Sequence, residues 1–179
     1  MKTVTQALRL FVLLTLLTGM AYPVMVTVAA RLVFRNQAGG SLVSRDGNPV
    51  GSALLAQKFE SPRYFWPRPS ASDYATVPSG ASNLGPTSEA LKKAIEERRA
   101  KFGADAPVEM LSASGSGLDP HISPHAAAQQ IERVAAARKL DAAHLASLVA
   151  ESTEPPQWGV FGEPRVNVLA LNLRLDAIQ

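Results

Sequence analysis

The chain has 179 residues, enough for one ordinary domain with an appendage but too few for two full domains. Its 46% apolar and 18% charged residues exclude a disordered chain, and the absence of cysteine excludes disulfides, a thiol nucleophile and cysteine-bound metal. Four of the eighteen basic side chains lie in the first 35 residues, which hold no acid. The fourteen that remain face fifteen acidic side chains, so the body is nearly neutral, which excludes a general nucleic-acid binder.

The first segment is a predicted membrane anchor. Residues 10–30 carry no charge, and at about 1.5 Å per residue they span about 31 Å, the thickness of a hydrocarbon core. Gly19 and Pro23 are tolerated in a membrane helix, where threonine hydroxyls can return to backbone carbonyls. We therefore expect a short tail over 1–9 and a transmembrane helix over 10–32. Basic residues flank the uncharged run 10–30 on both sides: Lys2, Arg9, Arg31 and Arg35.

A cleaved signal peptide is the competing interpretation, with a small-residue cleavage site at Val28-Ala29-Ala30. The apolar run is longer than the roughly 7–15 residues of a signal, which favours the anchor. The flanking charges nearly balance and say little about orientation. The short tail favours a cytoplasmic N-terminus and a domain on the other side of the membrane.

Turn-forming residues dominate the next stretch. Residues 33–52 read as a tether, with turn signals at Gly39-Gly40 and Asp46-Gly47 and a short strand at 41–44. Residues 53–60 are expected to form a short amphipathic helix. Residues 61–86 hold five prolines and many serines, which predicts irregular structure.

Three helices and one firm strand are predicted in the remaining domain, 53–179. Thr87–Phe102 is expected to form a charged surface helix ending at Gly103. Ser123 as N-cap and Pro124 in first position start a helix running to about Arg138, and Asp141 caps a helix over 142–151. Residues 108–113 are a possible strand. Residues 167–175 alternate leucine with smaller or polar residues, which predicts a half-buried strand.

These elements predict a small α/β domain, with α+β as the variant, behind one transmembrane helix. No catalytic motif accompanies them. The sequence has no P-loop and no nucleophile elbow, and Pro120 replaces the third glycine that a dinucleotide turn needs after Gly115 and Gly117. We therefore expect no enzyme activity from this chain alone.

Two groups of residues invite a catalytic or metal interpretation and are better explained as structure. Ser116, Asp119 and His121 lie too close in sequence for a triad that usually converges from distant segments, so a turn is favoured. His121 and His125 are four apart, but the predicted helix starts between them and no acidic third ligand follows at suitable spacing. No metal site is predicted.

Three aromatic residues lie between two arginines over 63–68 (RYFWPR), a pattern that can suit single-stranded nucleic acid. The neutral body favours a packed, proline-braced surface instead, or a protein contact. The mixed charges over 89–101 stand at spacings typical of a solvated helix face.

Four longer strings carry a resemblance over nearly the whole chain: 59–71 (FESPRYFWPRPSA), 79–87 (SGASNLGPT), 112–124 (SASGSGLDPHISP) and 162–176 (GEPRVNVLALNLRLD). In this order they resemble the KdpC family, the C subunit of the Kdp potassium-transporting ATPase. Ala81, Ser88 and His125 are small departures from the family's usual residues, and none removes a chemically distinctive group.

The resemblance implies a single-pass inner-membrane subunit of a bacterial high-affinity potassium pump, with its soluble domain in the periplasm. Its implied partners are a P-type ATPase subunit, a channel-like potassium-binding subunit and a very small accessory subunit. The family is described as a catalytic chaperone that raises the pump's affinity for ATP, so ATP is the implied cofactor, shared with the ATPase subunit. No prosthetic group is implied.

The serine-glycine loop supplies the nucleotide candidates Ser114, Gly115, Ser116 and Gly117, because it resembles the signature loop of ABC-type ATPases and could offer backbone amides to phosphate. A tight structural turn is the alternative. A periplasmic domain would never meet ATP, so a purely structural clamp on the channel-like subunit is a second hypothesis. A freestanding exported protein released after Ala30 is the third.

Overall fold

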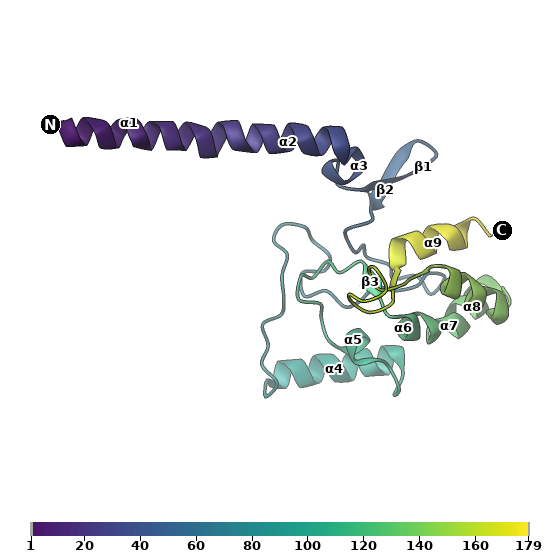
Figure 1. Ribbon diagram of the computed structural model, residues 1–179. Helices are drawn as coiled ribbons and strands as arrows, with labels where there is room; N and C mark the ends of the chain where they lie inside the picture. The colour runs from purple at the N-terminus through teal and green to yellow at the C-terminus, as the bar shows by residue number, and fades with distance from the viewer. Residues whose placement is uncertain (1, 179) are drawn as a thin grey trace. The chain divides into compact units, whose positions relative to one another are not determined.

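The structure is a computed structural model that describes residues 2–178 (Figure 1). It divides into two compact units, residues 1–50 and 51–179. The expected class is confirmed: one apolar N-terminal helix is followed by a small domain of mixed helices and strands.

A continuous helix forms most of the first unit. It consists of α1 (Lys2–Leu16), a five-residue π-helical segment (Leu17–Ala21) and α2 (Tyr22–Val33), and it is long and apolar enough to cross a membrane. The π segment ends two residues before Pro23, whose ring would clash with the carbonyl four residues earlier in a regular helix. As expected, threonine hydroxyls return to the backbone: Thr18 donates to the Leu14 carbonyl and Thr27 to that of Pro23, both at 2.7 Å.

A short helix and a hairpin follow. After α3 (Arg35–Ala38), β1 (Leu42–Arg45) and β2 (Asn48–Ser52) form a two-stranded sheet. Asp46 and Gly47 connect them with φ of 52° and 80°, and two positive φ values in a two-residue turn match the twist of a hairpin. The predicted strand is thus confirmed with a one-residue shift, and β2 is an additional strand.

The second unit is built around a small antiparallel sheet in the order β3-β5-β4, which places the fold in the α+β class. The strands are β3 (His121–Ile122), β4 (Thr153–Glu154) and β5 (Arg165–Asn167). Ile122 and Thr153 both pair with Val166, which is fully buried.

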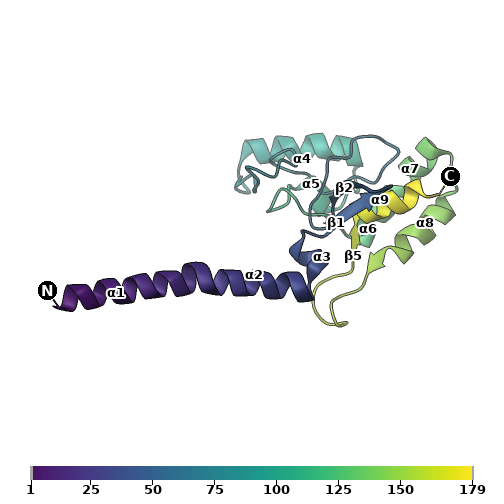
Figure 2. The same cartoon turned by 90° about the horizontal axis from the view of Figure 1, so that it is seen from above.

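Helices cover this sheet in two groups, which both views separate (Figures 1 and 2). One group is α4 (Glu89–Phe102) with α5 (Val108–Leu111). The other comprises α6 (Pro124–Ala128), α7 (Ile131–Arg138), α8 (Ala142–Glu151) and α9 (Val168–Asp176). The core between them contains the fully buried side chains of Phe65, Met110, Ile122, Val134, Leu145, Leu171 and Leu175.

Several predicted helix boundaries are confirmed. The charged helix ends at Gly103, which takes a φ of 100°. The Ser123 hydroxyl accepts from the Ala126 amide at 3.0 Å, with Pro124 in the first turn, and the Asp141 carboxylate accepts from the Ala143 amide at 3.1 Å. Both caps satisfy amides that have no partner within their helix.

The predicted strand over 167–175 is wrong, because this segment forms α9. Four of its five buried residues, Val168, Leu171, Asn172 and Leu175, recur with the three- and four-residue spacing of a helix; Leu169 is the fifth, and Leu173 is only half-buried. The Asn167 side chain caps the helix by accepting from the Ala170 amide at 3.0 Å.

Three further expectations are corrected. Residues 53–60 form no helix, because their backbone bonds to distant segments: the Ala56 amide donates to the Leu118 carbonyl and the Ala53 carbonyl accepts from Asn167 Nδ2. Residues 108–113 begin with the helical turn α5 rather than a strand, since Met110 and Leu111 are adjacent and both buried. The helix expected from 124 to 138 is interrupted at Gln129 and Gln130, where the second side chain turns into the protein.

Candidate functional site

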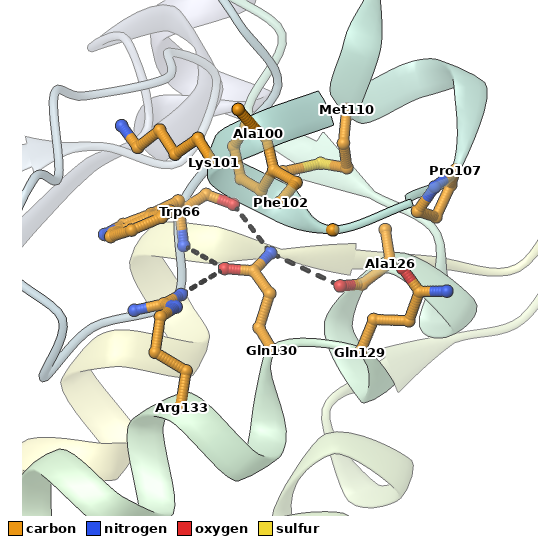
Figure 3. A pocket seen from close by; sticks show the side chains of 11 residues that line it. Trp66, Ala100, Lys101, Phe102, Pro107, Met110, Ala126, Gln129, Gln130 and Arg133 are labelled. Carbon is orange, nitrogen blue, oxygen red and sulfur yellow. Dashed lines mark hydrogen bonds between the residues drawn. The ribbon is translucent and has the colours of Figure 1, made fainter. Parts of the chain in front are cut away.

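Two buried side-chain amides hold the aromatic segment in place. Asn172 accepts from the Phe65 amide at 2.9 Å and donates to the Phe65 carbonyl at 3.0 Å. Gln130 does the same for Trp66, at 2.8 and 3.1 Å (Figure 3). The backbone N–H and C=O groups of this irregular segment therefore have hydrogen-bond partners, as they would in a strand. Buried backbone groups require such partners. The predicted packed interpretation of 63–68 is confirmed, since Phe65 and Trp66 are buried.

A cavity of about 340 Å³ lies beside Trp66. Its lining combines apolar side chains with two cations, and Figure 3 shows its residues: Trp66, Ala100, Lys101, Phe102, Gly103, Pro107, Met110, Ala126, Gln129, Gln130 and Arg133. The Arg133 guanidinium lies 3.6 Å from the centre of the Trp66 ring and the Lys101 ammonium 4.3 Å from it. Both distances are typical of cation–π contacts.

Within residues 2–178, the described hydrogen bonds of Arg133 all go to neutral acceptors. Its Nη1 donates to the carbonyls of Pro62 and Tyr64, and its Nη2 donates to Gln130 Oε1 at 2.6 Å. Burial lowers the pKa of Arg133 to about 10, so the guanidinium remains charged at neutral pH.

The four strings of the resemblance meet in this unit. The Ser114 amide donates to the Pro69 carbonyl at 2.9 Å, which joins the string 112–124 to the string 59–71. Arg68 Nη1 lies 2.9 Å from Asp119 Oδ2, and β3 pairs with β5. The Gly80 carbonyl from 79–87 packs against Gly117.

Hydrogen bonds fix both ends of the serine-glycine loop, residues 114–117. Ser114 is buried, and its carbonyl accepts from the Gly117 amide at 3.2 Å. The Ser116 hydroxyl accepts from the Leu118 amide at 3.1 Å. Gly115 and Ser116 are exposed beside a surface hollow of about 390 Å³, which Asp119 also lines. Because two of the loop's amides are already bonded and a carboxylate lines the hollow, the donor set fits a phosphate group poorly.

Replacing Gly117 by alanine is expected to lower the free energy of unfolding by at least about 2 kcal/mol. Gly117 has a φ of 73°, and an added Cβ would lie 2.8 Å from Ser72 Oγ and 2.9 Å from the Gly80 carbonyl oxygen. Gly115→Ala is the matched control, because nothing lies within 4 Å of its Cβ position. Urea denaturation of both variants checks this, and equal losses would contradict the packing described for Gly117.

Asp119 organises the turn that the triad interpretation had singled out. Its Oδ1 accepts from the His121 amide at 3.1 Å while Oδ2 faces Arg68. The His121 Nδ1 lies 3.9 Å from Asp119 Oδ1, and the Ser116 hydroxyl faces Leu118. Over residues 2–178, no group of three or more histidine, aspartate or glutamate side chains is placed to hold a metal.

Stability should fall as pH drops below about 6.5, and His121 should contribute to that fall. Burial, then Arg165, lowers the pKa of His121, against the opposing effect of Glu154 and Asp119. The unfolded chain therefore binds the proton first, and the contribution of His121 is lost as pH falls toward its folded pKa. His121→Gln should flatten the slope of stability between about pH 5 and 7. Denaturation across this range, with His144→Gln as the exposed control, measures the slope, and an unchanged slope would contradict the prediction.

An exposed apolar hairpin is the feature that sequence reasoning missed. Trp158, Val160 and Phe161 are 82%, 76% and 61% exposed, and the two aromatic rings stack edge to face at 6.0 Å. The Gln157 amide donates to the Phe161 carbonyl at 2.8 Å, which closes the turn. No charge occurs from Pro155 to Gly162, and this uncharged run around a tryptophan was the signal available in the sequence.

These features define a small domain that follows an apolar, membrane-length helix and carries an exposed apolar hairpin. The family model described as KdpC, "K+-transporting ATPase, c chain", matches residues 4–177. The chain belongs to the KdpC family.

Similar curated proteins support this membership. The chain is 53% identical to the potassium-transporting ATPase KdpC subunit of Burkholderia vietnamiensis, covering 100% of this chain and 98% of the relative. It is 51% identical to that of Cereibacter sphaeroides, covering 96% and 95%, and 50% identical to that of Dechloromonas aromatica, covering 99% of each.

Proposed function

We propose that this chain is a non-catalytic accessory subunit of an ATP-driven potassium import complex, and that it assists assembly and raises the ATP affinity of the P-type ATPase subunit. Membership of a family named for the c chain of a potassium-transporting ATPase supports the placement in that complex. Its other proposed partners in that complex are a channel-like potassium-binding subunit and a very small accessory subunit.

The exposed hairpin carries the proposal of a contact role. Its three large apolar side chains lie on a turn that is closed by its own backbone bond and ring contact. Tryptophan and other aromatic residues are enriched among the side chains that dominate binding between proteins. Solvating such a turn is unfavourable, and a partner subunit would remove it from water.

The same proposal places the N-terminus in the cytoplasm, the apolar helix in the inner membrane and the soluble domain in the periplasm. The length and apolar character of residues 2–33 suit a membrane span. In this arrangement the chain affects ATP use through contacts with the other subunits. Ser114, Gly115, Ser116 and Gly117 remain the candidates for any direct contact with nucleotide, although their donor set favours a structural turn.

A nucleotide titration tests the effect on ATP use. ATP hydrolysis by the purified complex is measured over a range of ATP concentrations, with and without this subunit. The proposal expects a weaker apparent ATP affinity without the subunit and recovery when it is added back. An unchanged affinity would overturn the chaperone role.

A purely structural clamp on the channel-like subunit is the second candidate function. The internal bonding of the serine-glycine loop favours it, since that loop then serves the fold alone. Under this alternative, removing the subunit reduces the amount of intact complex, while the complex that remains keeps its ATP affinity. Measuring both quantities on the same preparation separates the two functions.

A further inference from the structure

Tyr22 places a hydroxyl group near the middle of the apolar helix. It follows the π-helical segment, within the continuous helix of the first unit (Figure 1). Residue 20 is the midpoint of the uncharged run 10–30, so Tyr22 lies about 3 Å along the helix axis from the centre of a span. A hydrocarbon core extends about 15 Å to either side of its centre. A tyrosine side chain is too short to bring its hydroxyl from this depth to the headgroups.

The other polar side chains of this run are bonded within their own helix or can be. They are the three threonines Thr15, Thr18 and Thr27. Thr18 and Thr27 donate to carbonyls four residues earlier, both at 2.7 Å, and rotation of its hydroxyl lets Thr15 do the same. The Tyr22 hydroxyl stands at the far end of a ring, out of reach of its own backbone. Tyr22 is 60% exposed, and no hydrogen bond from its hydroxyl is described within residues 2–178.

The turn that precedes Tyr22 and Pro23 is also open to a neighbour. Pro23 has no backbone N–H, so one carbonyl of this turn loses its usual amide donor. Gly19 lies in the π-helical segment of the same turn, and no other atom lies within 4 Å of the position that its Cβ would occupy. Residues 17–23 therefore offer a hydroxyl donor, a carbonyl acceptor and a place where another backbone can approach closely.

Hydrocarbon supplies no water to bond these groups, so a polar partner must come from another protein segment at the same depth. Polar side chains of transmembrane helices bond across to neighbouring helices, and small residues let the two backbones approach. The family is named for the c chain of an ATPase, so this chain has partner subunits. A helix of such a subunit is the neighbour that the composition of residues 17–23 suits.

We propose that residues 17–23 bind a transmembrane helix of another subunit of the complex. The Tyr22 hydroxyl donates to a polar group of that helix near the middle of the membrane, and Gly19 lets the two backbones approach. This inference rests on the proposed membrane span, but it does not depend on the effect on ATP use or on the exposed hairpin.

Photocrosslinking identifies the neighbour of Tyr22 directly. The substitution Tyr22→p-benzoylphenylalanine is made in the full chain, which is expressed together with the other subunits and irradiated in membranes. Val24→p-benzoylphenylalanine is the matched control, because Val24 lies at almost the same depth and residues two apart in a helix point to different sides. We expect a product that joins this chain to another subunit, with a much lower yield from position 24.

Each other result overturns the proposal. A product of two copies of this chain would show a homodimer, and the absence of any protein product would show that Tyr22 faces lipid. Equal yields from both positions would show that the contact is not specific to the Tyr22 side of the helix. Carbonate extraction of the same membranes separates the two levels of the account. A chain that is washed off has no span, whereas a retained chain without the product has a span but lacks this contact.

Removing the hydroxyl alone tests its bond. Tyr22→Phe should weaken association with the other subunits roughly threefold, as is typical for the loss of one hydrogen bond between transmembrane helices. Thr18→Val is the matched control and should associate like the parent, because the Thr18 hydroxyl is bonded within its own helix. Retention of this chain on a tagged subunit, measured over a dilution series in mild detergent, gives the apparent affinity. Undiminished association of Tyr22→Phe, or equal losses in both variants, would overturn the proposed bond.

Discussion

Replacing Gln130 by leucine is expected to lower the free energy of unfolding by about 3–5 kcal/mol, the largest stability effect of any single substitution considered. The change leaves the Trp66 amide and carbonyl buried without the partners they have at 2.8 and 3.1 Å. It also removes the acceptor of Arg133 Nη2 and the donor to the Ala126 carbonyl. Each buried polar group left unsatisfied costs about 1–3 kcal/mol.

The neighbouring residue provides the matched control for this prediction. Gln129 is exposed, and its described contacts are to the Asp105 carbonyl and the His125 ring. Gln129→Leu should therefore change the free energy of unfolding by less than about 1 kcal/mol. Urea denaturation of both variants in a Trp158→Phe background, followed by the emission of Trp66, measures the two losses. Similar losses for the two would show that the buried amide does not hold the aromatic segment.

Changing Trp158 and Phe161 together to aspartate should reduce association with the partner subunits at least about thirtyfold, the effect of losing about 2 kcal/mol at a binding hot spot. Both side chains are exposed, so the substitution should leave the thermal stability of the isolated subunit unchanged. Affinity purification of the complex through a tag on another subunit measures how much of this chain is retained.

Val108 provides a control that separates the effect of the hairpin from the effect of replacing any exposed apolar side chain by aspartate. It is 78% exposed and lies at the start of α5, far along the chain from the hairpin. Val108→Asp should assemble like the parent, because an acidic residue suits the first turn of a helix. Equal retention of the hairpin variant and the parent would contradict the contact role of residues 157–161.

The features that the sequence predicted correctly are those that a few adjacent residues determine. The Ser123 and Asp141 caps and the glycine stop after α4 require only a few adjacent residues, and the structure has all of them. The apolar first helix could also be predicted from the sequence, because its length and composition are properties of one continuous segment. The antiparallel pairing of β3, β5 and β4 joins residues far apart in sequence, and no local pattern predicts it.

The errors occurred where tertiary contacts override a local pattern. The leucines of 169–175 fit a period of two, but Asn167 caps a helix there and Asn172 must face Phe65. Gln130 interrupts a helix that its sequence would continue, because its amide completes the backbone of a segment more than sixty residues away. Likewise, the cavity depends on α4, α5 and α6 meeting at Trp66, which composition and spacing do not reveal.

The side of the membrane on which the serine-glycine loop lies is the most direct test of the account, since it decides whether this domain acts by contact or by binding nucleotide. The chain has no cysteine, and Ser116 is exposed, so Ser116→Cys introduces a single reactive thiol. Intact cells are treated with a membrane-impermeant maleimide. The account predicts labelling from outside, before lysis. Labelling only after lysis, with the protein shown to be folded and assembled, would place the loop in the cytoplasm and contradict the account.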